Sequence, residues 1–389
     1  MSKHALSPTV ANSRTKSGPT PVSAAGRALQ GASYIPTVIL RGDMDALAIQ
    51  EAVDLPFKSV NDGVMHACGH DSHTAIVLGA AKVLKSMEDE LIAMGGSVRL
   101  MFQPAEEGGA GALRMMEEGG LDGADAAVMI HTGSALEVGK IASKPGIMLA
   151  GSSRLTIKIE GVGGHAAYPH TATDVVVAAA AVITGVHGIV SRIVPPTESA
   201  IISLTTVHGG DAFNVLPNSI MVGGTFRFFD KEMRDLMMSS IRLRAESIAA
   251  SYGCTAVVDF GEDEVKVNSR GVEWKGVMYS PVFNNEEMYE IGKATAEELF
   301  EEDVWNLIED VSMGGEDFGF VSNAVPSLQV GMGHRSPEHE TDRTASNHHN
   351  PLFEMDERMI PRGSAFLASL AVKVIERFNA AKNAGSGEL

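Results

Sequence analysis

Cysteine, histidine and glutamate occur in two short segments in a pattern that could bind a metal ion. The first segment holds Cys68 and His70, with one residue between them, and the second holds the adjacent pair Glu106 and Glu107. Thiolate, imidazole and carboxylate groups are the ligands of zinc and its neighbours in the divalent series. A bound metal lowers the pKa of a water, and a spare carboxylate beside it can accept that water's proton. The combination therefore predicts a hydrolase in which one glutamate is a ligand and the other a base.

Each piece alone has a simpler explanation. Cys68 could be a small buried thiol near a surface imidazole, and adjacent glutamates usually lie on a solvated surface. However, Glu106 follows a strand-like run at residues 97–102 and precedes Gly108 and Gly109. Carboxylates at the end of a strand, before a glycine-rich turn, lie where open α/β sheets place their sites. We therefore favour the functional interpretation of this pair.

The composition excludes several classes of protein. The chain has 389 residues, 44% of them hydrophobic, which is enough for two domains with substantial cores. It has 31 basic and 49 acidic residues and a net charge of −18. This balance argues against a nucleic-acid or anionic-membrane partner, because phosphate binding needs clustered Lys and Arg. The longest apolar run, residues 175–186, is too short to span a membrane, and a buried helix explains it.

The two cysteines, Cys68 and Cys254, cannot form a disulfide framework. Sparse cysteine, with one residue used as a thiolate, suits a reducing compartment. We therefore expect a cytoplasmic protein. A mitochondrial location is the weaker alternative, because residues 1–42 contain basic residues but no acid.

The expected elements indicate an α/β protein built on a doubly wound, mixed sheet. Residues 1–33 have the composition of a disordered leader. Strand-like runs then occur at residues 34–40, 98–102 and 126–130. The last of these is expected to end directly at His131, and helical spacing covers residues 74–87. Strands that alternate with helices are typical of a doubly wound sheet.

A different pattern begins near residue 150 and indicates an inserted domain. Strand, helix, strand, strand, helix and strand are expected at residues 154–160, 174–192, 200–207, 219–229, 231–250 and 255–260. This order is typical of a small α+β sandwich. We therefore predict a metal-binding domain formed by residues 34–149 and 264–389, with an inserted domain at residues 150–263.

Short motifs follow one another along the chain in an order that resembles the M20 metallopeptidase family. They are RGDMDAL at 41–47, HACGHD at 66–71, FQPAEEGG at 102–109, GGHAAYPH at 163–170, FNVLP at 213–217, GTFR at 224–227, GEDF at 315–318 and HNPLF at 349–353. The resemblance covers roughly residues 35–375. It is strongest to the amidohydrolase branch, with its hippurate hydrolases, N-acyl-amino-acid amidohydrolases and plant hydrolases of auxin–amino-acid conjugates. Each motif alone is weak, but the ordered set is specific.

The resemblance implies a catalytic domain with two divalent metal ions, which would be zinc, manganese or cobalt. The ligands that it implies are Cys68, His70, Glu107, His131 and His349. Cys68 would bridge the two ions, and Glu106 would be the general base. The choice between the two glutamates comes from the family rather than from spacing. His348 stays an alternative to His349, one residue away.

The resemblance also implies that the inserted domain is a lid that forms a homodimer. In the family, the residue at the position of His165 reaches the active site of the partner subunit and stabilises the developing oxyanion. His170 is a candidate substrate contact. Asn214 and Arg227 are candidates for binding the substrate's carboxylate or carbonyl, a task that suits a charge-assisted Arg contact.

Two acidic residues outside the ligand set are further candidates. Asp45 follows a strand end near the predicted metals and could orient a ligating imidazole, although turn chemistry explains it almost as well. Glu316 could be a polar group of the substrate pocket or a solvated loop acid.

The predicted reaction is hydrolysis of an N-acyl amino acid to a carboxylic acid and a free amino acid. The alternatives within the same fold are an exopeptidase, such as a carboxypeptidase or dipeptidase, and an N-deacetylase. A third is a truncated, non-catalytic oligomerisation protein, because residues 1–33 do not resemble the N-terminal helix and strand of the family. A cysteine-nucleophile hydrolase is the least favoured, since the adjacent carboxylates would have no task in it.

Overall fold

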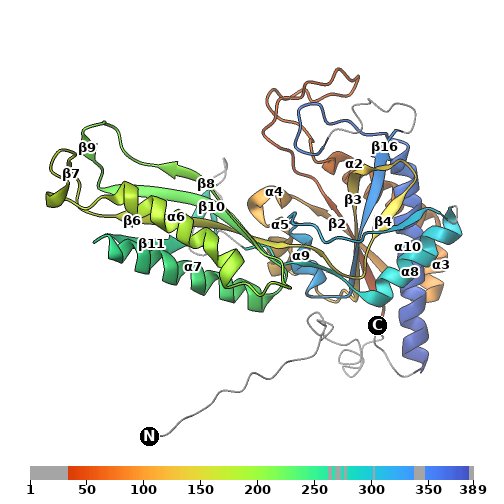
Figure 1. Ribbon diagram of the computed structural model, residues 1–389. Helices are drawn as coiled ribbons and strands as arrows, with labels where there is room; N and C mark the ends of the chain where they lie inside the picture. The colour runs from red at the N-terminus through yellow and green to blue at the C-terminus, as the bar shows by residue number, and fades with distance from the viewer. Residues whose placement is uncertain are drawn as a thin grey trace, which may run out of the picture.

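The protein folds into two bodies, each with its own sheet and its own buried core (Figure 1). A computed structural model describes residues 34–261, 265–267, 273–275, 278–300, 303–336 and 347–384. The predicted disordered leader, residues 1–33, lies outside these ranges. The mixed main sheet and the separate antiparallel sheet confirm the predicted fold class.

The main sheet has six strands in the order β15-β4-β16-β3-β1-β2. Their bounds are β1 Thr37–Asp43, β2 Ser97–Gln103, β3 Ala126–Glu137, β4 Ile141–Ser143, β15 Trp305–Leu307 and β16 Ser327–Arg335. β2, β1, β3 and β16 are parallel neighbours, and β4 pairs antiparallel with β16. The carboxyl ends of β1, β2 and β3 therefore meet at one edge of the sheet, where an α/β sheet places its site.

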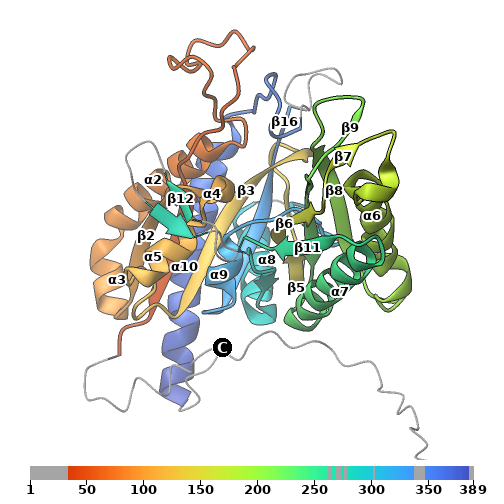
Figure 2. The same cartoon turned by 90° about the vertical axis from the view of Figure 1, so that its left-hand side faces the viewer.

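Helices cover both faces of this sheet (Figure 2). The helices are α2 His70–Ser86, α3 Glu88–Met94, α4 Glu106–Gly109, α5 Gly111–Glu117, α8 Glu286–Leu299, α9 Phe318–Ser322 and α10 Met359–Ala384. Val38 and Leu40 of β1 pack into the same core as α2, α8 and α10, whereas Ile39 packs with α5 and α9. Burial of both faces explains why the central strands are continuous apolar runs without alternation.

The inserted domain is a four-stranded antiparallel sheet in the order β11-β6-β10-β8. Its main elements are β6 Gly151–Glu160, α6 Val175–Arg192, β8 Ile201–His208, β10 Ser219–Phe228, α7 Lys231–Ser251 and β11 Thr255–Asp259. The predicted order and approximate bounds of all six are confirmed. The apolar stripes of α6 and α7 pack on the sheet, and the Asp174 carboxylate caps α6 by accepting from the amides of Val176 and Val177.

Smaller elements link and extend the two bodies. They are β5 Gly146–Leu149, β7 Gly164–His165, the 3₁₀ turn η1 Pro169–Thr171, β9 Val215–Leu216, β12 Val265–Val267, β13 Glu273–Lys275 and β14 Val282–Asn284. β7 pairs with β9 at the end of the inserted domain that lies farthest from the main sheet (Figure 1). β5 pairs with β14 where the two bodies join.

The end of β3 and the length of α6 each bear on an expectation drawn from the sequence. β3 does not end at His131 but continues to Glu137, because β16 supplies a parallel partner as far as Arg335. The prediction of a strand end at His131 was therefore wrong. By length and composition α6 would be able to cross a bilayer, a test that the core helix of a soluble protein also passes. One face of α6 is buried in the core of the inserted domain.

Candidate metal centre and active site

The candidate ligands come from four segments that meet at the carboxyl edge of the main sheet. Cys68 lies in the loop before α2, and His70 is the first residue of that helix. Glu107 lies in the short turn after β2, and His131 lies within β3. His349 belongs to the loop before α10. The parallel packing of β1, β2 and β3 is what brings these segments together.

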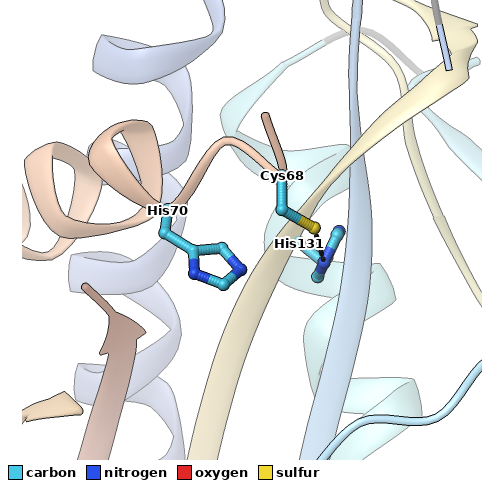
Figure 3. Close-up of side chains that lie close together, drawn as sticks. All are labelled: Cys68, His70 and His131. Atoms are coloured by element: carbon cyan, nitrogen blue, oxygen red, sulfur yellow. Dashed lines mark hydrogen bonds between the residues drawn. The ribbon is translucent and has the colours of Figure 1, made fainter. Parts of the chain in front are cut away.

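Cys68, His70 and His131 form the first donor group (Figure 3). One donor atom from each lies within 4.8 Å of the others, and Sγ of Cys68 is 3.7 Å from Nε2 of His131. Nδ1 of His131 lies 2.8 Å from the Thr132 carbonyl, which can only accept, so we assign the proton to Nδ1. Nε2 then presents a lone pair toward Cys68, as a metal ligand requires.

Cys68, Glu107 and His349 form the second donor group, also within 4.8 Å of one another. Oε1 of Glu107 lies 3.0 Å from Nε2 of His349. The two groups therefore share Cys68, so its sulfur is within reach of both donor sets. His348, one residue earlier, points elsewhere, because its Nε2 lies 2.8 Å from the Thr132 hydroxyl. The geometry thus favours His349 over His348 as the ligand.

Buried donor atoms without partners fit a bound cation. Nε2 of His70 and Oε1 of Glu107 are buried and form no hydrogen bond in the described part of the chain. The short distance from Glu107 to His349 is thus a contact without hydrogen-bond geometry. A buried polar atom without a partner is costly, and a cation would remove that cost. Thiolate, imidazole and carboxylate donors suit zinc, manganese or cobalt, so the residues fit the metals that the motifs imply.

The surroundings of Cys68 disfavour its thiolate form unless a cation lies beside the sulfur. Burial, followed by the charges of Glu107 and Glu106, raises the pKa of Cys68 above its ordinary value. A divalent cation at the same place reverses this effect, because it is the largest local charge and deprotonates a coordinating thiol. The donor set is therefore suited to binding metal rather than to nucleophilic attack by a free cysteine.

Asp45 holds the turn that carries the two glutamates. Its Oδ1 accepts a hydrogen bond from the Glu106 amide and its Oδ2 from the Glu107 amide, each at 3.0 Å. Nδ1 of His70 lies 3.0 Å from the Asp45 carbonyl and 3.5 Å from Oδ1. Asp45 therefore contacts the His70 imidazole, and the nearer contact is its backbone carbonyl. The main task of its carboxylate, positioning Glu106 and Glu107, was missed.

His73 supports the site without being available as a ligand. Nδ1 of His73 lies 2.6 Å from the Asp43 carboxylate, and Nε2 accepts a hydrogen bond from the Thr132 amide at 2.9 Å. Both ring nitrogens are thus engaged, and burial lowers the pKa of His73 to about 4. Because Thr132 is the residue that fixes the tautomer of His131, this chain of contacts orients a candidate ligand.

A buried charge network surrounds the candidate base. The Arg41 guanidinium, almost fully buried, lies 2.6 Å from Asp43, 2.9 Å from Glu316 and 3.0 Å from Asp317. A buried Arg of this kind must be paired, since an uncompensated charge costs several kcal/mol (about 3–5 when one partner is lost). Glu316 is therefore an ion-pair partner in the interior and not a solvated loop acid. Its predicted role in substrate binding stays a prediction.

Glu106, the candidate general base, lies beside the candidate ligands. One of its carboxylate oxygens lies within 4.8 Å of ligand atoms of His70 and Glu107. Burial, then the charges of Glu316 and Asp317, raise the pKa of Glu106 well above its ordinary value, and Arg41 offsets part of this rise. A carboxylate with a raised pKa beside a metal centre can accept and return a proton near neutral pH.

Within one chain, the predicted catalytic residue His165 and the predicted substrate contacts His170 and Asn214 lie away from this centre. His165 lies in β7, His170 in η1 and Asn214 just before β9, and all three are exposed. These elements lie at the far end of the inserted domain (Figure 1). Arg227 of β10 lies beside the Gly315 backbone, where an added Cβ would come within 2.9 Å of its Nη1. Sequence spacing alone could not place these residues.

Comparison with known proteins identifies relatives over most of the chain. Residues 39–373 match the model of peptidase family M20/M25/M40. The chain is 39% identical to IAA-amino acid hydrolase ILR1-like 5 of Arabidopsis thaliana over 347 residues, 89% of this chain and 75% of the relative. It is 37% identical to an N-acetylcysteine deacetylase of Bacillus subtilis over 348 residues, 90% of this chain and 84% of the relative.

A solved structure shows the same fold. It is a dinuclear metal-binding peptidase of the M20 family from Bacillus subtilis, 33% identical in sequence. The TM-score is 0.71, and the match covers 89% of this chain and 83% of the other.

Proposed function

Because the chain belongs to peptidase family M20/M25/M40, we propose that it hydrolyses the amide bond of N-acyl amino acids. The observation that carries this proposal is the pair of donor groups that share Cys68, with the buried Glu106 beside them. The relatives named above support the substrate class, since their names describe an IAA-amino acid hydrolase and an N-acetylcysteine deacetylase. The products would be a carboxylic acid and a free amino acid.

Five side chains would hold the two divalent ions, and a sixth, Glu106, would move the proton. The ligands would be Cys68, His70, Glu107, His131 and His349. When bound, the ions lower the pKa of a water and polarise the amide carbonyl. Glu106 would accept a proton from the attacking water on its carboxylate and deliver it to the leaving nitrogen. Asp45 keeps Glu106 and Glu107 in place throughout, through their amides.

The inserted domain would complete the site in a homodimer. β8 is an edge strand of its sheet, and Val207 on it is 54% exposed, so a second copy could pair with this edge. His165 of one chain would then stabilise the oxyanion in the site of the other. The remoteness of β7 from the metal centre of its own chain supports this arrangement (Figure 1). Arg227, Asn214 and His170 would contact the substrate.

A substrate panel tests the proposal. Protein reconstituted with zinc, manganese or cobalt is incubated with N-acetyl and N-benzoyl amino acids and with dipeptides, and release of the free amino acid is measured. We expect release from the N-acyl amino acids that is abolished by chelator and restored by metal. Release from dipeptides alone would favour the exopeptidase alternative. Protein that binds no metal and releases nothing would favour the non-catalytic alternative.

A further inference from the structure

Tyr279 lies where the inserted domain joins the main domain. Its amide donates to the Ser152 carbonyl at 2.8 Å, and its carbonyl accepts from the Ser152 amide at 3.0 Å. Ser152 is near the start of β6, the first strand of the inserted domain, and residue 279 leads into β14 of the main domain. The paired segments 146–152 and 279–284, which we call the hinge, thus connect the two bodies within the described part of the chain.

The side chain of Tyr279 reaches from the hinge to the turn that carries the catalytic glutamates. Its hydroxyl donates to the Glu106 carbonyl at 2.5 Å and accepts from the amides of Gly108 at 2.9 Å and Ala110 at 3.2 Å. One hydroxyl thus binds three backbone groups within five consecutive residues. Its ring packs edge-on against Phe320, so the direction of the side chain is fixed by a second contact.

That turn has a backbone conformation that its sequence does not favour. Ala105 and Ala110 have φ angles of 60° and 52°, in the left-handed region that residues with a Cβ rarely adopt. Each such residue is strained and persists only when surrounding contacts hold it. Asp45 holds the turn from one side through the amides of Glu106 and Glu107. Tyr279 holds it from the other.

We propose that Tyr279 is a positioning residue that couples the orientation of the lid to the geometry of Glu106 and Glu107. Residues from both bodies, including Phe228, Tyr279 and Asn323, line a cavity of about 500 Å³ beside the hinge. The described side chains therefore leave open space on this side of the hinge. A rotation of the hinge that displaces residue 279 would move the Tyr279 hydroxyl. Because this hydroxyl binds the backbone of residues 106–110, that segment would move with it.

The proposal predicts how removing one oxygen atom affects the turn. Tyr279→Phe keeps the ring and removes the three hydrogen bonds. Tyr289→Phe is the matched control, because the Tyr289 hydroxyl accepts from the Trp305 indole at 3.1 Å, remote from the site between α8 and β15. In the metal-free proteins, we expect amide hydrogen exchange of a peptide spanning residues 106–110 to become about tenfold faster in Tyr279→Phe and to stay unchanged in Tyr289→Phe.

The kinetic test rests on the proposed amide hydrolysis, whereas the exchange test needs no substrate. With an N-acyl amino acid that the parent cleaves, we expect Tyr279→Phe to lower kcat by about tenfold to a hundredfold, because a small misplacement of catalytic groups is costly. KM and metal content should stay near the parent values. Tyr289→Phe should lower Tm without this fall in kcat. If the unmutated protein were inactive, the proposed function would be rejected. The hydrogen-exchange comparison would then test the positioning role of Tyr279 alone.

A hinge variant tests the coupling itself. An added Cβ at Gly151 would come within 2.8 Å of the Tyr279 carbonyl and 2.5 Å of the Phe228 ring, so Gly151→Ala displaces the hinge. We expect Gly151→Ala to lower kcat in the parent but to have little further effect in the Tyr279→Phe background. Equal effects in both backgrounds would overturn the coupling. Unchanged exchange and unchanged kcat in Tyr279→Phe would overturn the positioning role.

Discussion

Oε1 of Glu107 lies 3.0 Å from Nε2 of His349, although Glu107 follows the second strand and His349 precedes the last helix. Neither atom reaches the other unless the whole main domain has folded, and both lie within 4.8 Å of a donor atom of Cys68. The unfolded chain has no preformed site, so metal binding to these atoms stabilises the folded state. The metal content of variants is therefore a direct test of which residues are ligands.

Cys68 and Cys254 form a matched pair for the first test. Both thiols are buried, but Cys254 lies in the core of the inserted domain. We expect Cys68→Ser to lower metal content with a small effect on the thermal unfolding of the metal-free protein, and Cys254→Ser to lower Tm with metal content unchanged. Elemental analysis of the purified proteins measures the metal. Equal metal content in Cys68→Ser and the parent would mean that Cys68 is not a ligand.

His348 and His349 allow a second comparison between adjacent residues. His349→Ala removes a donor next to Glu107, so metal content and turnover should both fall. His348→Ala removes the contact with the Thr132 hydroxyl and should retain at least one more equivalent of metal than His349→Ala. Competition with a chelator of known affinity measures the difference. The reverse order of metal affinity would assign the ligand to His348.

The proposed dimer can be tested at the two edges of the inserted sheet. Val207 on β8 and Val257 on β11 are similarly exposed, at 54% and 58%, on opposite edge strands. Val207→Glu should give a monomer, because burying a charge in an edge-to-edge interface is costly. Val257→Glu should stay dimeric. Light scattering at micromolar concentration measures the mass, and a monomeric parent would contradict the proposal.

The variants Val207→Glu and Val257→Glu also test whether His165 acts across the interface. The Val207→Glu monomer should lose turnover while it keeps its metal, since the ligands all come from one chain. The Val257→Glu protein should keep both. A fully active monomer would show that no residue of a second chain completes the site.

Much of the fold follows from the sequence because its signals are local. Helical spacing predicts α6, and alternation predicts the strands of the inserted domain. The end of β3 was misjudged because its last residues are held by pairing with β16, a partner distant in sequence. Local pattern carries no information about such a partner.

The sequence predicts some residues of the candidate site and not others, because only some of them belong to a local pattern. Glu106 and Glu107 stand out because two carboxylates follow a strand and precede glycines. The ion pairs of Arg41 with Glu316 and Asp317 join residues far apart in the chain, so no spacing indicates them. An arginine that directly follows an apolar run in a buried strand is the one available signal, since a buried guanidinium needs acidic partners.

The most direct test of the account compares Glu106→Gln with Glu107→Gln, measuring metal stoichiometry and turnover side by side. Glu106 is the proposed proton carrier, so its variant should keep two metal ions per chain and lose about 10²–10⁴-fold in kcat. Glu107 is a proposed ligand, so its variant should lose metal together with activity. Metal loss in Glu106→Gln and retention in Glu107→Gln would reverse the two roles. Full activity in both variants would contradict the metallohydrolase mechanism itself.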